Sequence, residues 1–120
     1  MNKPGITLNR VLIGLGLSRY RLHKATGIHS SDLYRITHGT RKISPGVALR
    51  LGEYFKNIDP RELSIASRGF KRLNAEFWYS LQSEYILWES KVKHREKIGE
   101  IKPYRMPRKP PSAHQIDKSH

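Results

Sequence analysis

Polar side chains recur on one face of residues 30–38, where Leu33 and Ile36 are expected to face inward. Short side chains at the start of such a face let a backbone approach base edges, and an arginine can make two hydrogen bonds to guanine in the major groove. The predicted base-reading residues are Ser30, Ser31, Tyr34 and Arg35, with His38 on the same face. The alternative is an ordinary helical hairpin whose outer face is solvated.

Further polar and basic residues flank this face on both sides. Ser18 and Arg19 begin the preceding predicted helix, and a helix N-terminus favours a phosphate group. Thr40, Arg41 and Lys42 follow the predicted reading helix, where a DNA backbone would pass. The complete predicted DNA-contacting set is Ser18, Arg19, His29, Ser30, Ser31, Tyr34, Arg35, His38, Thr40, Arg41 and Lys42.

Residues 18–38 have the pattern of a helix-turn-helix, which would hold these side chains in place. A first short helix is expected to carry Leu22 and Ala25 inward. Gly27 then supplies the permissive backbone that a sharp turn needs. Ile28 follows as an apolar plug between the two helices.

The charge of the chain favours a polyanionic partner. The formal net charge is +13, and it is unevenly distributed. Residues 1–57 carry ten Lys or Arg against two acids, residues 58–90 carry four against five, and residues 91–120 carry nine against three. Clustered cations gain affinity for nucleic acid through counterion release. Solubility alone, or an anionic membrane surface, are the alternatives.

Several classes of protein are disfavoured. The chain has no cysteine, and its longest apolar run, residues 11–17, is far shorter than the ~20 residues of a membrane helix. The six histidines show no metal-binding spacing, and no catalytic constellation is present. We expect a cytoplasmic protein that is not an enzyme, with no metal, cofactor or small-molecule ligand.

The remaining pattern predicts more helices and no strands. Thr7 is expected to cap a helix that ends at Gly16, with inward positions Leu8, Val11, Leu12 and Leu15. Ser44 before Pro45 predicts another helix start, with a buried stripe of Val47, Ala48, Leu51 and Phe55.

The second half of the chain predicts a short helix beginning at Asp59 and a long helix capped by Asn74, roughly residues 75–93. The long helix carries an aromatic stripe that either packs on the core or contacts a second protomer or a toxin. The predicted interface residues are Phe77, Trp78, Leu81, Tyr85 and Trp88.

We divide the all-α chain into four parts. Residues 1–57 form the helix-turn-helix domain and residues 58–73 an inserted segment. Residues 74–98 form the C-terminal helix, and residues 99–120, rich in proline and basic residues, are expected to be disordered.

Two stretches resemble a known family. Residues 15–51, LGLSRYRLHKATGIHSSDLYRITHGTRKISPGVALRL, resemble the helix-turn-helix domain of the HigA-type antitoxins, within the phage-repressor-like (Cro/C1, or XRE) superfamily. NAEFWYSLQSEYILWE, residues 74–89, resembles the segment that follows in HigA proteins. The resemblance implies a lambda-repressor-like bundle of about five helices and a homodimer that represses its own operon at an inverted repeat. It also implies a RelE/HigB-like mRNA-cleaving toxin as partner.

Three features depart from that family pattern. His23 stands where the family usually has alanine, about fifteen residues are inserted near residues 58–73, and the tail is longer and more basic than expected. The inserted segment and the longer tail affect the predicted partner-binding surfaces more than the predicted DNA binding. An orphan or phage-derived repressor without a toxin, and a basic protein that coats nucleic acid without sequence preference, are the alternative functions.

Overall fold

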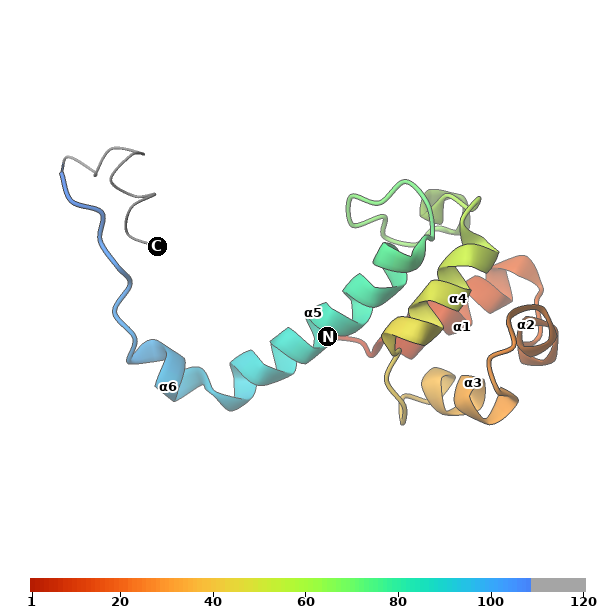
Figure 1. Ribbon diagram of the computed structural model, residues 1–120, viewed down its shortest axis with the longest axis horizontal. Coiled ribbons are helices and arrows are strands. Elements are labelled where there is room, and N and C mark those ends of the chain that lie inside the picture. Colours follow the sequence, from red (N-terminus) through yellow and green to blue (C-terminus); the bar gives the residue numbers. More distant parts are fainter. Residues whose placement is uncertain (109–120) are drawn as a thin grey trace. The chain divides into compact units, whose positions relative to one another are not determined.

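The computed structural model describes residues 1–108, and all regular structure in that range is helical (Figure 1). The elements are α1 (Pro4–Leu15), α2 (Arg19–Thr26), α3 (Ser30–Thr37), α4 (Pro45–Phe55), the 3-10 helix η1 (Pro60–Leu63), α5 (Ala75–Lys93) and α6 (Arg95–Gly99). The predicted all-α class is therefore confirmed. The chain divides into a unit spanning Met1–Ser90 and a second unit beginning at Lys91.

Most predicted helix ends are confirmed because the capping groups make the expected bonds. Gly16 and Gly27 have φ angles of 61° and 75°, the left-handed conformation that closes α1 and α2. The Ser44 Oγ accepts a hydrogen bond of 3.2 Å from the Val47 N–H at the start of α4. The Asn74 Oδ1 accepts one of 2.9 Å from the Phe77 N–H at the start of α5.

Some predicted positions are corrected. Helix α1 begins at Pro4 rather than after Thr7, because proline is favoured at the first helical position, and Pro4 and Gly5 are also buried. Leu15 is 41% exposed, and Ala25 is exposed as well, so neither belongs to the core. The long helix α5 ends at Lys93, as predicted, so residues 74–98 hold two helices rather than one, with His94 as the N-cap of α6 between them.

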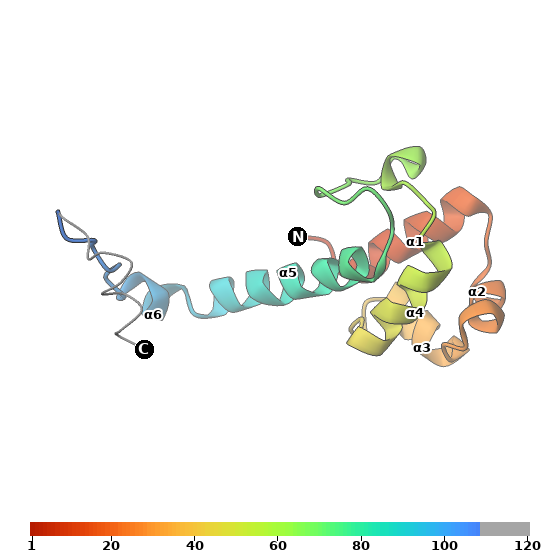
Figure 2. The same cartoon turned by 45° about the horizontal axis from the view of Figure 1, so that its top comes forward.

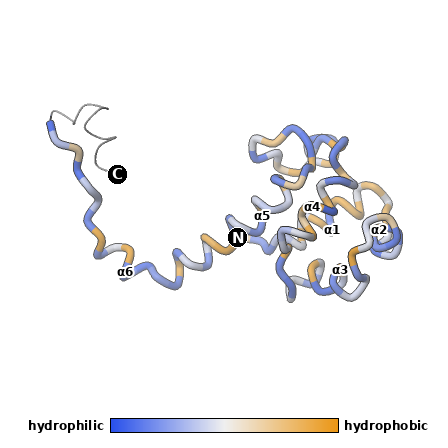
Figure 3. The backbone as a smooth tube through the Cα atoms, in the orientation of Figure 1, coloured by the Kyte–Doolittle hydropathy of each residue, from blue (hydrophilic) through white to orange (hydrophobic). Residues whose placement is uncertain are grey.

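The core lies in the unit Met1–Ser90, where apolar stretches alternate with polar ones along α1 and α4 (Figure 3). Its largest side chains form an aromatic cluster. The Trp78 ring centroid lies 5.8 Å from that of Phe55 and 5.4 Å from that of Phe77. The Trp78 Nε1–H also donates a 3.1 Å hydrogen bond to the Leu73 carbonyl, so its one polar atom is satisfied.

The burial of Phe77 and Trp78 corrects the predicted interface. Both side chains have no exposed surface, so they pack on the core and are unavailable to a second protomer or a toxin. Leu81 and Tyr85 are half-buried, and Trp88 is 38% exposed. An interface role remains a prediction for these three residues.

Residues 58–73 form a loop that leaves α4, passes through η1 and returns to the start of α5 (Figure 2). Ile65 and Leu73 from this loop are buried in the core. Asp59 caps η1 and also binds the Arg61 guanidinium, at 2.7 Å between Oδ2 and Nη2. The side-chain and backbone hydrogen bonds from Arg61 lower the pKa of Asp59 to about 2.

The predicted disordered tail is described only in part. Residues 101–108 carry no helix or strand, and their side chains are exposed. The predicted boundary is corrected at its start, because Gly99 is the last residue of α6 and Glu100 is its C-cap. Residues 109–120 lie outside the described residues.

Candidate nucleic-acid interface

Helices α2 and α3 form a rigid pair because their facing side chains are buried. Leu22 from α2 and Leu33 and Ile36 from α3 have no exposed surface, and Ile28 fills the turn between the helices as predicted. The Arg50 guanidinium of α4 donates a 2.7 Å hydrogen bond to a carbonyl in the last turn of α2. A cation at a helix C-terminus also complements the helix dipole.

His23, unexplained by the sequence, closes this turn. Its Nδ1 lies 2.6 Å from the Ile28 carbonyl oxygen, in a partly buried position. A carbonyl oxygen only accepts hydrogen bonds, so Nδ1 carries the hydrogen and donates it. Thr26 supports the same turn: its Oγ1 accepts a 3.3 Å hydrogen bond from the Ile28 N–H. A helix-crossing position that alanine would occupy is here used for a hydrogen bond across the turn.

The predicted reading face exists as a surface in the structure. Ser30, Ser31, Tyr34, Arg35 and His38 are all exposed, while the opposite side of α3 is buried. An eight-residue helix with one buried and one polar exposed side can be inserted in a groove without losing its core contacts. His29 is also exposed and stands at the N-cap of α3 without a side-chain capping bond.

Two members of the reading face are ordered by contacts with each other and with α2. The Tyr34 and His38 rings are stacked, with centroids 3.9 Å apart and planes 21° apart. The His38 Nδ1 lies 2.8 Å from the Tyr34 carbonyl oxygen. From α2, the Arg19 guanidinium carbon lies over the Tyr34 ring, 4.9 Å from its centroid.

The segment after α3 is tied to the same helix. The Thr40 Oγ1 and the Arg41 N–H donate to the Arg35 carbonyl oxygen at 3.2 and 3.3 Å. The Arg41 guanidinium also lies 3.3 Å from the carboxylate of Asp32, in the first turn of α3. Sequence reasoning missed Asp32, because the segment between it and Arg41 includes the end of α3 and the turn that follows, and no helical spacing joins the two side chains. Lys42 is exposed, as predicted.

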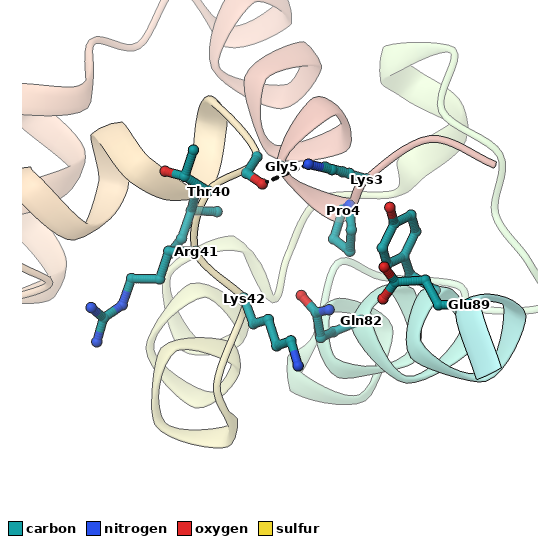
Figure 4. Close-up of a pocket in the computed structure, with 11 residues that line it drawn as sticks. Lys3, Pro4, Gly5, Thr40, Arg41, Lys42, Gln82 and Glu89 are labelled. Carbon is teal, nitrogen blue, oxygen red and sulfur yellow. Dashed lines mark hydrogen bonds between the residues drawn. The ribbon is translucent and has the colours of Figure 1, made fainter. Parts of the chain in front are cut away.

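A hollow behind this segment shows what holds it from the other side (Figure 4). The Lys3 Nζ donates a 3.0 Å hydrogen bond to the Gly39 carbonyl, and the buried Gln82 Oε1 accepts one of 2.8 Å from the Ile43 N–H. Figure 4 shows both side chains at the hollow and the Arg41 side chain extending away from it. Lys3, which immediately precedes α1, and Gln82 of α5 thus hold the chain that leaves α3.

Residues 1–108 hold neither a cluster of metal-binding side chains nor a helix that could span a membrane. No group of three His, Asp or Glu side chains in that range is arranged to hold a metal ion. None of the described helices is long and apolar enough to cross a membrane.

Comparisons with known proteins place this geometry in context. No family model matches the chain. Virulence-associated protein A' of Dichelobacter nodosus is 32% identical over 84 residues, which represent 70% of this chain. The chain spans 60% of the length of that relative.

Solved structures match over most of the chain. An addiction module antidote protein of the HigA family from Coxiella burnetii superposes with a TM-score of 0.64 and 28% identity, covering 86% of this chain and 97% of that one. The Pseudomonas aeruginosa antitoxin HigA, solved with the higBA promoter, gives a TM-score of 0.63 and 27% identity, covering 87% and 98%. These likenesses confirm the predicted resemblance, and the chain has the helix-turn-helix fold of the HigA-type antitoxins.

Proposed function

We propose that the protein binds double-stranded DNA in a sequence-specific manner and inserts α3 into the major groove. The observation that carries this proposal is the division of α3 into a fully buried side and an exposed polar side bearing Tyr34 and Arg35. The excess of cations in residues 1–57 provides the electrostatic attraction. The Pseudomonas relative that was solved with promoter DNA supports the same target class. We propose that the protein is cytoplasmic, where such a DNA target would be found.

We propose that the active form is a homodimer that represses its own operon at an inverted repeat. One α3 helix reads only a few base pairs, and a two-fold pair of helices reads half-sites about 34 Å apart. The half-buried Leu81 and Tyr85 and the exposed Trp88 on α5 are the proposed contacts for the second protomer or for a toxin.

We further propose that the protein is an antitoxin that inhibits a RelE/HigB-like mRNA-cleaving toxin. The antitoxin part of this proposal is supported by the two solved relatives, an antidote protein and an antitoxin. The second candidate is a repressor without a toxin. It is favoured by the small acidic surface of α5, where Glu84 is paired with Arg68. Co-expression with the product of the neighbouring gene separates the two. Formation of a complex and restored growth would support the antitoxin function. If no complex forms and growth is not restored, the protein is a repressor without a toxin partner.

Replacing two arginines tests the DNA proposal. Arg35→Ala is expected to weaken binding by about 1–3 kcal/mol and to relax preference at one base pair, because it removes the guanidinium that reads a base. Arg41→Ala is expected to weaken all sequences alike and to reduce the slope of log K against log salt by about one, because its target is a phosphate. Fluorescence anisotropy with the protein's own promoter and a scrambled duplex measures both. Equal binding of the two duplexes by the unaltered protein would contradict sequence-specific recognition.

A further inference from the structure

Arg19 occupies a position from which two different actions on DNA are possible. It begins α2, where a guanidinium could bind a phosphate as the sequence predicts. In the structure, however, this guanidinium lies over the Tyr34 ring of α3, and its Nη1 reaches within 3.5 Å of the Thr37 Oγ1. Both contacts direct the side chain toward the reading helix.

We propose that Arg19 is a specificity-determining positioning residue, which acts on bound DNA through the ring of Tyr34 rather than as a ligand of a phosphate. The inference rests on the proposed DNA-binding function and deepens it. A residue of α2 thereby orients a base-reading side chain of α3.

Tyr34 needs such an orienting contact because of its exposure. The ring is 52% exposed, so packing on the core does not select its rotamer. The stack with His38 and the guanidinium of Arg19 restrict it instead. A side chain that is ordered before binding loses less conformational entropy when it meets a base, and it reaches the same base in every complex.

Thr37 connects the positioning contact to the backbone of the same helix. Its Oγ1 donates to the Leu33 carbonyl at 2.9 Å and lies beside the Arg19 Nη1. Leu33 is fully buried, so this hydroxyl has a fixed place on α3. The Arg19 guanidinium therefore contacts both the exposed Tyr34 ring and a fixed hydroxyl group on α3, the helix that carries this ring.

The two actions of Arg19 have different consequences for base preference. A phosphate ligand contributes equally to every sequence and adds to the salt dependence. A positioning residue changes preference only at the base pair that Tyr34 contacts, and only while the Tyr34 ring is present. An exposed cation–π contact corresponds to a change of about two- to five-fold in that preference.

A double-mutant cycle on base preference tests the proposal. The probe is a duplex enriched by the unaltered protein from a random library, together with every single-base-pair variant of it. Affinities are measured for the unaltered protein, Arg19→Ala, Tyr34→Ala and the double variant. Two control variants separate charge from shape. Arg19→Lys keeps the charge and removes the planar group, and Arg21→Ala removes an equal charge from another exposed position on α2.

We expect Arg19→Ala to lower preference at one base pair by about two- to five-fold, at the position that Tyr34→Ala also affects. In the Tyr34→Ala background, the same change should alter no preference. Arg19→Lys should share part of the loss, while Arg21→Ala should leave the preferences unchanged.

A uniform loss of affinity from Arg19→Ala, with a smaller salt dependence and full rescue by Arg19→Lys, would overturn the inference and leave the DNA-binding proposal intact. If no sequence is enriched by the unaltered protein, the proposed function itself fails. Circular dichroism melting confirms that each exposed-site variant is folded before its affinities are compared.

Discussion

Gly52→Ala is expected to lower the free energy of unfolding by about 3 kcal/mol, although alanine is the better helix former. A Cβ atom at residue 52 would meet the backbone of Ala75 and lie 2.8 Å from the carbonyl carbon of Asn74. Both neighbours are backbone atoms at the start of α5, so they cannot move aside as the end of a side chain can. Helices α4 and α5 would have to separate, and the core between them would open.

Gly46→Ala provides the matched control on the same helix. Gly46 is exposed, and the nearest atom to its added Cβ is the Ser44 Oγ at 3.9 Å. The free energy of unfolding should stay equal or rise by up to about 1 kcal/mol. Thermal melting should place the Gly52→Ala midpoint more than about 10 °C below that of Gly46→Ala. Equal midpoints would contradict the close approach of the two helices.

Trp78→Ala is expected to cost about 3–5 kcal/mol of unfolding free energy. The ring is fully buried beside Phe55 and Phe77, and its removal would leave a large cavity in the centre of the unit. The Leu73 carbonyl would also lose its hydrogen bond from the indole. Urea unfolding followed by circular dichroism measures the loss.

Trp88→Ala is the contrasting variant, because Trp88 lies on the same helix as Trp78 but closer to its C-terminal end. Its ring is 38% exposed and contacts Tyr85 at 5.7 Å between centroids. Its loss should change the unfolding free energy by about 1 kcal/mol or less. If Trp88 belongs to the proposed dimer contact, sedimentation will show weaker self-association. A large loss of stability from Trp88→Ala and a small one from Trp78→Ala would reverse the assignment of core and surface.

These two tryptophans show where sequence reasoning stops. Both lie on one helix with helical spacing, and the spacing alone left core packing and interface contact open for each. The difference comes from residues outside α5 that surround Trp78: Phe55 of α4 lies against its ring and the Leu73 carbonyl accepts its N–H, whereas Trp88 is 38% exposed. Burial of one aromatic residue thus depends on a tertiary contact that no local pattern contains.

The helix ends were predictable because capping is local. Ser18, Ser44 and Asn74 each accept a hydrogen bond from a backbone N–H three residues later, which requires only the right side chain at the right place. The start of α1 was missed although Pro4 at its first position is a local signal for a helix start. The further contact of Gly5 with the backbone of Ile36 and Thr37 joins distant parts of the chain, and no local pattern contains it.

The candidate interface divides in the same way. The exposed face of α3 followed from helical periodicity, and the structure exposes the predicted residues. The contacts that orient them, from Arg19 to Tyr34 and from Asp32 to Arg41, join side chains whose meeting depends on the turn and on the exit of the chain from α3. His23 belongs to this group, because its carbonyl partner lies across the turn.

The central claim is that α3 reads specific base pairs as part of a two-fold pair. In vitro selection from random duplexes, followed by sequencing, tests it most directly. If α3 reads bases in this way, one half-site is enriched, present twice in inverted orientation with centres about one helical turn apart, and the same sequence stands in the promoter of the protein's own gene. Enrichment of no sequence, together with equal affinity for random and promoter duplexes, would contradict the account.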